Sequence, residues 1–215
     1  MLRADICELT VLLAQCIDEM AVYAGVEQQV KEITHRAMNG ELDFEQSLRQ
    51  RVGLLRGVSA EIIPHIVAAI QYTPGAKFLC KTLKKMGYKL AVISGGFTHI
   101  IKHVKDKLNL DYSFANTLEI RDGKLTGQLL GPIVDARKKA DLLDLIAQEE
   151  GIPHDQVIAI GDGANDLLML SRAGLGIAFN AKPKVQEAAK FRINQASLAT
   201  LIYFLGISDR SVDSF

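Results

Sequence analysis

The sequence predicts an α/β fold: a doubly wound parallel sheet with an inserted helical cap and a small β-hairpin flap. From residue 76 onward, apolar strand-like runs alternate with longer helical patterns, which implies right-handed crossovers between parallel strands. Residues 17–72 carry helical patterns instead, so we expect them to form an insertion. The pair Asp122-Gly123, between two runs of strand-forming residues, is typical of a tight hairpin turn.

Four helices are expected in the insertion. Apolar side chains over residues 17–24 follow the i, i+3, i+4, i+7 spacing of an amphipathic helix. Similar patterns over residues 30–38 and 44–55 predict a second and a third helix. Ser59 is a suitable N-cap for a fourth helix, which we expect Pro64 to interrupt because proline removes a backbone hydrogen bond. These helices make up the predicted cap.

The remaining elements alternate along the chain, and glycines follow several of them. Helices are predicted over residues 76–87, 98–108, 136–150, 164–172 and from residue 183. Strands are predicted over residues 89–94, 156–161 and 176–179, and a hairpin over residues 116–130. We therefore assign residues 1–15 and 73–215 to the core domain, and residues 16–72 to the cap.

Composition and charge exclude several classes of function. Lysine plus arginine and aspartate plus glutamate both number 25, so the sequence gives no electrostatic sign of a nucleic-acid or membrane partner. The three scattered cysteines fit a reducing compartment, so we expect a cytoplasmic protein without a disulfide framework or a zinc site. No apolar run is long enough to predict a membrane span.

The segment Gly161–Asp166, which reads GDGAND, carries the strongest chemical signal. An apolar strand ends at Gly161 and delivers Asp162 to the carboxyl edge of the sheet, where open α/β folds bind ligands. Asp162 is a candidate ligand for Mg²⁺, which prefers one or two carboxylates plus phosphate and water. Asn165 would contact phosphate or orient water. Asp166 would hold a lysine or a metal-bound water, or is an ordinary carboxylate in a first helical turn.

Two further strand-to-helix edges carry polar groups suited to a phosphate. Ser94-Gly95-Gly96 offers a hydroxyl and backbone N–H groups to an anion, although a Gly-Gly pair is also common in plain tight turns. Lys139 at a helix start is a compact charge suited to phosphate, although a lone lysine is usually a solvated residue. The order of hydroxyl, lysine and paired acids makes the set far more specific than any single member.

This set resembles the second, third and fourth motifs of the haloacid dehalogenase superfamily of phosphatases. The resemblance sharpens to the phosphoserine phosphatase family through the segments 18–26, 44–49, 110–116, 122–127 and 177–183, and it covers roughly residues 16–205. It implies a HAD-like, Rossmann-type core. The implied activity is Mg²⁺-dependent hydrolysis of the small molecule O-phospho-L-serine to serine and phosphate, the last step of serine biosynthesis.

The resemblance also implies roles for individual residues. In the core, Ser94, Gly95 and Gly96 would bind the phosphoryl group, Lys139 would neutralise it, and Asp162 would ligate Mg²⁺ with Asn165 and Asp166 beside it. In the cap, Arg51 would pair with the substrate carboxylate, and Met38 and Phe44 would close over the substrate. The plainer interpretations are that Met38 and Phe44 are core residues and that Arg51 is a solvated charge.

The first motif of the family is broken in this chain. That motif is Asp-x-Asp-x-Thr, whose first aspartate is the covalent nucleophile and whose second is the general acid/base. Alignment without gaps puts Ile6, Glu8 and Thr10 at the three motif positions. Glu8 keeps a carboxylate and is the candidate acid/base and metal ligand. Gln15 replaces the family glutamate that binds the substrate amino group.

Three explanations compete for this local change. The first fifteen residues are an altered start of an ordinary enzyme, or the protein is a natural pseudoenzyme, or Asp5 or Glu8 substitutes through a register shift. An abrupt boundary between a degraded and an intact region favours the first explanation. The function expected is thus a phosphoserine phosphatase impaired by its first motif, with an inactive phosphoserine-binding protein as the alternative. A third and weaker hypothesis is that the protein is a different phosphatase of the same superfamily.

Overall fold

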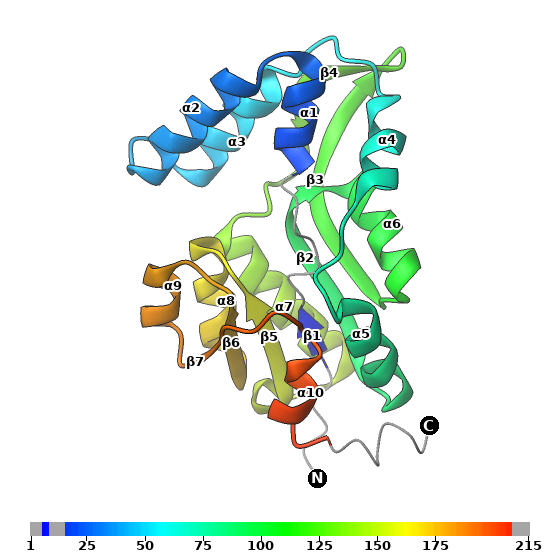
Figure 1. Cartoon of the computed structure of the whole chain (residues 1–215), viewed down its shortest axis with the longest axis vertical. Helices are drawn as coiled ribbons and strands as arrows, with labels where there is room; N and C mark the ends of the chain where they lie inside the picture. Colours follow the sequence, from blue (N-terminus) through cyan, green and yellow to red (C-terminus); the bar gives the residue numbers. More distant parts are fainter. Residues whose placement is uncertain (1–5, 9–15, 208–215) are drawn as a thin grey trace.

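The protein is built on a seven-stranded sheet in the order β4-β3-β2-β1-β5-β6-β7 (Figure 1). The computed structural model describes residues 16–207 in full and the backbone of residues 6–8. The strands are β1 (Ile6–Glu8), β2 (Lys89–Phe97), β3 (Tyr112–Arg121), β4 (Lys124–Leu130), β5 (Val157–Gly161), β6 (Leu175–Phe179) and β7 (Phe191–Ile193). All neighbouring pairs are parallel except β3 with β4.

The helices divide between a group at the end of the sheet and two layers on its faces. The first group is α1 (Cys16–Ala24), α2 (Glu27–Met38), α3 (Phe44–Gly53) and α4 (Ile62–Ala69). The second group is α5 (Ala76–Lys85), α6 (Thr98–Leu108), α7 (Ala136–Glu150), α8 (Leu167–Arg172), α9 (Pro183–Ala188) and α10 (Thr200–Phe204). Two short 3₁₀ turns are η1 (His154–Gln156) and η2 (Ala164–Asp166).

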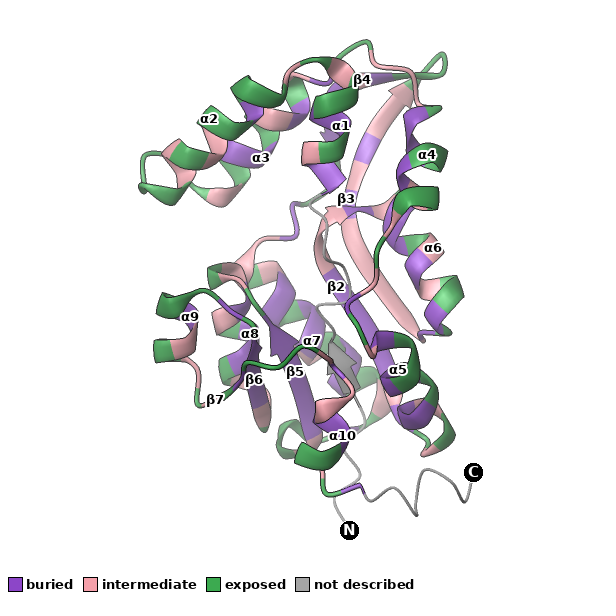
Figure 2. Ribbon diagram, in the orientation of Figure 1, coloured by how far each residue is buried: buried purple, intermediate pink, exposed green. Residues whose placement is uncertain are grey.

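Strands β5 and β6 bury both of their faces, as Figure 2 shows. Alternate residues of β5 face opposite sides, as the two-residue period of a strand requires. Ile158 and Ile160 pack with α5, α6 and α10, whereas Val157 and Ala159 pack with α7 and α8. Helices therefore cover both faces of the sheet, which confirms the predicted doubly wound α/β class.

Helices α1, α3 and α4 share one apolar cluster, here called the cap cluster, with the far end of the β3–β4 hairpin. Its buried members are Cys16, Ile17, Met20, Leu48, Val52, Leu55, Ile62, Ile63, Ile66, Phe97, Ile100, Leu118, Leu125, Leu129 and Ile133. Backbone bonds of 2.8 Å also join Gly57 N–H to Leu125 O and Leu125 N–H to Val58 O. The hairpin flap thus packs with the helical insertion rather than apart from it.

Several predicted elements need correction. Pro64 does not interrupt a helix: it lies in the first turn of α4, where the missing N–H has no helical partner to lose. The sheet is mixed, because β3 pairs with β2 in parallel and turns at Asp122-Gly123 into antiparallel β4. The short elements β7 and α10 have no counterpart among the predictions.

Strand β1 lies at the centre of the sheet, between β2 and β5. Glu8 pairs with Ala91 of β2 and with Ala159 of β5. Ser94 and Asp162 each lie three residues beyond those partners, which is about 10 Å along a strand. In this register the backbone of Glu8 is therefore well short of the carboxyl edge of the sheet.

Candidate active site

The Gly161–Asp166 loop at the end of β5 is held by the carboxylate of Asp166. Its Oδ2 accepts hydrogen bonds from the backbone N–H groups of Asp162 (3.1 Å) and Gly163 (2.9 Å). Its Oδ1 accepts one from the Lys139 ammonium at 2.6 Å. The sequence left open whether Asp166 holds a lysine, and in the structure it does hold Lys139. By accepting these three hydrogen bonds, Asp166 clamps the loop to α7, and its predicted role beside a metal stays a prediction.

Close approach requires glycine at the start of this loop. A β-carbon at residue 161 would lie 2.4 Å from Cβ of Asp166 and 2.7 Å from its Oδ2. A β-carbon at residue 163 would lie 2.3 Å from Oδ1 of Asn165, the end of a side chain that can turn away. The loop therefore folds over the Asp166 side chain because residue 161 is glycine.

Lys139 and Asp166 form a buried ion pair. The two residues are 5% and 3% exposed. Asp135 caps α7 by accepting a hydrogen bond from the Lys138 N–H at 2.7 Å, and this cap fixes the start of the helix that carries Lys139. Lys139 is therefore not the solvated lysine of the plainer interpretation: its charge is directed into the carboxyl edge of the sheet.

Asp162 lies beside this pair, and the protein disfavours its ionised form. The residue is exposed at the sheet edge, yet desolvation by the surrounding protein raises the pKa of its carboxyl. The charge of Asp166 raises this pKa further, whereas the charges of Lys139 and Lys182 lower it. A carboxylate in this condition is stabilised by an added cation.

The Ser94-Gly95-Gly96 segment forms a bulge at the end of β2. The pairing of β2 with β3 shifts between Ile93 and Phe97, and within the bulge the Ser94 hydroxyl oxygen accepts a bond from the Gly96 N–H at 3.0 Å. The Gly96 N–H, predicted to bind phosphate, is thus engaged by Ser94 in this structure. The hydroxyl hydrogen of Ser94 stays able to donate.

Three elements meet at Gly95. A β-carbon there would lie 3.0 Å from Cζ of Phe44 on α3 and 4.0 Å from Nδ2 of Asn165. The β2 bulge, the β5 loop and the helical insertion therefore converge at the carboxyl edge of the sheet. Phe44 also packs against the cap cluster, so it serves both the helical core and the site.

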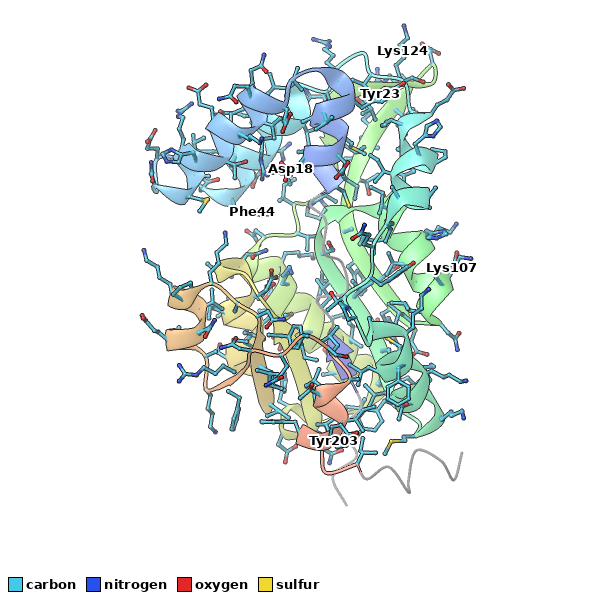
Figure 3. All side chains as sticks on the ribbon, in the orientation of Figure 1. Asp18, Tyr23, Phe44, Lys107, Lys124 and Tyr203 are labelled. Atoms are coloured by element: carbon cyan, nitrogen blue, oxygen red, sulfur yellow. The ribbon has the colours of Figure 1, made fainter. Side chains whose placement is uncertain are left out.

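Arg51 and Met38 are the other predicted cap residues in the described part of the chain. Arg51 is half-buried and its Nε donates to Ser47 O at 3.3 Å. Burial lowers the pKa of its guanidinium, and the charge of Asp18 raises it. Figure 3 shows Asp18 on α1 and Phe44 at the start of α3, both on the side of these helices that is nearer the core. Met38 is 67% exposed, so its interpretation as a core residue is wrong.

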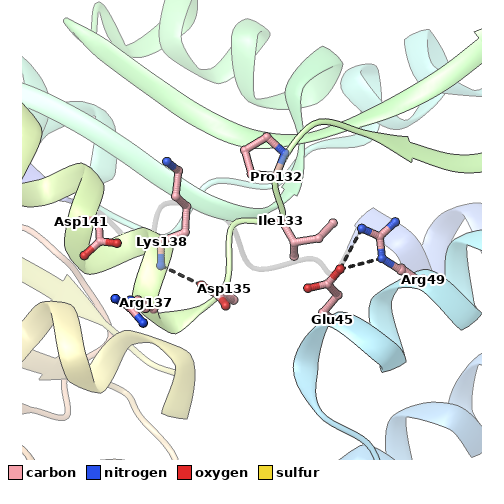
Figure 4. A pocket seen from close by; sticks show the side chains of 8 residues that line it. All are labelled: Glu45, Arg49, Pro132, Ile133, Asp135, Arg137, Lys138 and Asp141. Carbon is pink, nitrogen blue, oxygen red and sulfur yellow. Dashed lines mark hydrogen bonds and ion pairs between the residues drawn. The ribbon is translucent and has the colours of Figure 1, made fainter.

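A hollow of about 310 Å³ lies at the seam between α3 and the start of α7 (Figure 4). Glu45 and Arg49 line it from α3, where they pair with each other at 2.8 Å. Pro132, Ile133, Asp135, Arg137, Lys138 and Asp141 line it from the other side. None of Ser94, Lys139 or Asp162 lines this hollow, so it flanks the site and is not the place of the predicted chemistry.

The remaining predicted residues lie outside the described part of the molecule. These are Gln15 and the side chain of Glu8, and the predictions for both stay predictions. Among the described residues no cluster of three or more His, Cys, Asp or Glu side chains forms a metal site. Lys182 is a site residue that the sequence argument did not single out, although its segment is one that resembles the family.

Comparisons with known proteins show the family to which this fold belongs. A family model of haloacid dehalogenase-like hydrolases matches residues 10–171. The chain belongs to this family. A phosphoserine phosphatase of Methanocaldococcus jannaschii is 45% identical over 196 residues, which cover 91% of this chain and 93% of that protein. Another, of Streptomyces coelicolor, is 50% identical over 205 residues, and the match spans 50% of that longer protein.

Solved structures place this haloacid dehalogenase-like hydrolase in the phosphoserine phosphatase branch of its family. A substrate-bound phosphoserine phosphatase complex superposes with a TM-score of 0.86 at 44% identity, covering 93% of this chain and 96% of that one. A phospho-aspartyl intermediate analogue of a phosphoserine phosphatase superposes with a TM-score of 0.87 at 43% identity, covering 95% and 99%. The predicted fold and family are thereby confirmed.

Proposed function

We propose that this protein hydrolyses O-phospho-L-serine to L-serine and phosphate with the aid of Mg²⁺. The observation that carries the proposal is the buried Lys139–Asp166 pair at the sheet edge where the Ser94-Gly95-Gly96 bulge also ends. A phosphoryl group at this edge would meet the Lys139 ammonium and the Ser94 hydroxyl. Both would stabilise negative charge on its oxygens.

The residues of this edge fit Mg²⁺. Desolvation and the charge of Asp166 raise the pKa of Asp162, so its carboxylate would gain from an added cation. We assign Asp162 as the protein ligand and Asp166 as the residue that holds the loop beside it. Mg²⁺ commonly keeps several waters and needs only one or two carboxylates plus a substrate phosphate. Bound there, Mg²⁺ would neutralise phosphoryl charge.

The helical insertion, residues 16–72, would act as a cap that selects the amino acid over the core formed by residues 1–15 and 73–215. Arg51 would pair with the substrate carboxylate, a bidentate role that guanidinium suits. Phe44 already contacts the phosphate-binding bulge, so closure around a ligand would exclude water at that point. Met38 of the cap would close over the substrate, and Gln15, at the end of the first core segment, would contact its amino group.

The cellular role that follows is the last step of serine biosynthesis in the cytoplasm, on a small-molecule substrate and without a nucleic-acid or membrane partner. The balanced charge of the chain supports this assignment. Within residues 6–8 and 16–207, no helix has the length and apolar character needed to span a membrane.

The altered first motif is the one observation behind a second candidate function, which the similarity to phosphoserine phosphatases does not favour. Residues 1–15 contain no Asp-x-Asp, and a covalent phosphatase without its nucleophile loses most of its rate. A protein that keeps Ser94, Lys139 and Asp162 would still bind phosphoserine. Under this alternative the chain is a phosphoserine-binding protein without turnover.

Phosphate release from O-phospho-L-serine with Mg²⁺ separates the two candidates. The chain should be compared with Asp162→Asn and with a variant carrying Ile6→Asp, Glu8→Asp and Gln15→Glu. We expect slow release by the chain, loss in Asp162→Asn, and a large gain in the repaired variant. Stabilisation by phosphoserine without release in any variant would favour the binding protein. If the protein neither releases phosphate nor is stabilised by phosphoserine, both candidate functions are contradicted. Faster release from phosphothreonine or phosphosugars would assign another substrate.

A further inference from the structure

Asn116, in the middle of β3, is almost fully buried, with 1% of its surface exposed. It is paired with Phe97, just beyond the Ser94-Gly95-Gly96 bulge. Between the pairs Ile93–Phe114 and Phe97–Asn116, three residues of β2 stand against Ala115 of β3. Strand pairing is therefore interrupted where the bulge forms, and its backbone carbonyls need other donors.

The side chain of Asn116 supplies those donors. Its Nδ2 donates to the carbonyl oxygen of Gly95 at 2.8 Å and to that of Gly96 at 3.4 Å. Its Oδ1 accepts a hydrogen bond from the Val134 N–H at 2.8 Å. One side chain therefore holds the phosphate-binding bulge on one side and the segment before α7 on the other.

The contact with Val134 continues to Lys139 over a few residues. Asp135 follows Val134 directly and caps α7, and the Lys139 N–H donates to Asp135 O at 2.9 Å. The position of Val134 thus sets where α7 begins, and α7 carries the ammonium that meets Asp166. Asn116 joins two of the three edges that form the site.

We propose that Asn116 is a positioning residue that fixes the Ser94–Gly96 bulge relative to Lys139, and thereby sets the affinity of the site for phosphate. The proposal rests on the proposed function, because it assumes that phosphate binds at this edge. Aspartate cannot replace asparagine here. One oxygen of its carboxylate would still accept from the Val134 N–H, but the other would face the carbonyl oxygens of Gly95 and Gly96 with no hydrogen to donate.

The test compares Asn116→Asp with Asp111→Asn, a matched control at the opposite end of the same two strands. Asp111 accepts from the Leu90 N–H at 2.8 Å and pairs with Lys84 at 2.7 Å, so asparagine there removes the charge that pairs with Lys84 and weakens a side chain that joins β2 to the start of β3. Inorganic phosphate is titrated in the presence of Mg²⁺ by calorimetry, which does not depend on turnover.

We expect Asn116→Asp to bind phosphate about tenfold more weakly than the unaltered protein. A tenfold change in affinity corresponds to about 1.4 kcal/mol, which is the size of one lost hydrogen bond. Asp111→Asn should change the affinity for phosphate less than about twofold, although this variant is expected to unfold at a lower denaturant concentration than the unaltered protein. Equal affinities in Asn116→Asp and the unaltered protein would overturn the proposal, as would equal losses in the two variants. No phosphate binding by the unaltered protein would instead contradict the proposed function.

A measurement on the unaltered protein covers the case in which Asn116→Asp does not fold. In a ¹⁵N-labelled sample, the side-chain amide of Asn116 should be protected from solvent exchange and should shift when inorganic phosphate is added. The side-chain amide of Asn39, which contacts His35 on exposed α2, should do neither. A rapidly exchanging Asn116 amide, or one indifferent to phosphate, would overturn the proposal.

Discussion

The core edge and the cap hold their site residues in different ways. At the core edge, Asp166 accepts three hydrogen bonds of 2.6 to 3.1 Å, and Asn116 makes bonds of 2.8 Å to both of its neighbouring segments. In the cap, Arg51 donates from Nε to Ser47 O at 3.3 Å, and Met38 is largely exposed. Phe44 of the cap lies next to Gly95 in the Ser94-Gly95-Gly96 bulge of the core.

This difference separates two tasks of the proposed function. The groups that would bind phosphate are fixed by the fold before any ligand arrives, so little ordering is needed when phosphate binds. The groups that would recognise the amino acid depend on how the cap sits above them. We therefore expect changes at the core edge to affect stability and phosphate binding together, whereas changes in the cap affect discrimination between ligands.

The largest effect is expected from Lys139→Ala. This change leaves the carboxylate of Asp166 buried without its counter-ion, which costs about 3–5 kcal/mol of unfolding free energy. It should also abolish measurable phosphate binding. Urea unfolding and phosphate titration check both effects.

Lys138→Ala is the matched control for this change. Lys138 is the preceding residue on α7 and contributes its backbone N–H to the cap made by Asp135, a bond that alanine preserves. Its substitution should alter stability by less than about 0.5 kcal/mol. If Lys139→Ala and Lys138→Ala proved equally stable, the buried pair would not hold the core edge.

A smaller loss is expected from Gly161→Ala. The added β-carbon would overlap the Asp166 side chain, and overpacking of this kind costs about 1–3 kcal/mol. Gly53→Ala on cap helix α3 is the control, because nothing lies within 4 Å of the added atom. It should stabilise the protein by about 0.5–1 kcal/mol. Denaturant titration should therefore show a lower unfolding free energy for Gly161→Ala and a higher one for Gly53→Ala. A destabilised Gly53→Ala would contradict this difference between core edge and cap.

The smallest effect on stability is expected from Asp162→Asn, and it has the opposite sign. Desolvation, followed by the charge of Asp166, raises the pKa of Asp162 in the folded state, so its ionised form opposes folding at neutral pH. The amide should raise the melting temperature of the metal-free protein by at most about 2 °C.

The pH dependence gives the sign of this effect. The gain should begin to fall as the pH falls through the raised pKa of Asp162, and it should be gone below the ordinary pKa of aspartate, where the carboxyl is neutral in both the folded and the unfolded chain. In Mg²⁺ the order should reverse, because only the carboxylate gains from the cation. Melting curves in chelator and in Mg²⁺ measure both, and a lower melting temperature of Asp162→Asn in chelator would contradict this account.

The parts of the fold with clear end signals could be predicted from the sequence. The helices over residues 98–108 and 136–150 were predicted with the bounds that α6 and α7 have. Gly151 was the end signal for α7, and in the structure both Asn109 and Gly151 take the left-handed conformation that ends a helix. The three residues of β7 and five of α10 are too short for a periodic pattern to stand out. The register of β1 depends on pairing with β2 and β5, which no local pattern contains.

The candidate site divides in the same way. The spacing of Ser94, Lys139 and Asp162 indicated that these residues share one edge, because parallel strands end there together. That Asp166 holds the lysine, and that Asn116 spans the bulge, depends on side chains from different strands. The register of β1 also bears on Glu8, the candidate acid/base and metal ligand. Its partners Ala91 and Ala159 lie three positions before Ser94 and Asp162, so its backbone does not reach the carboxyl edge of the sheet.

The most direct test of the division between core and cap is a pair of calorimetric titrations, with inorganic phosphate and with O-phospho-L-serine, both in Mg²⁺. Arg51→Ala should bind phosphoserine about tenfold more weakly and phosphate unchanged within about twofold. Lys139→Ala should lose both ligands, and Arg49→Ala, whose side chain pairs with Glu45 on the same helix, should lose neither. Equal losses of phosphate and phosphoserine in Arg51→Ala would contradict the account.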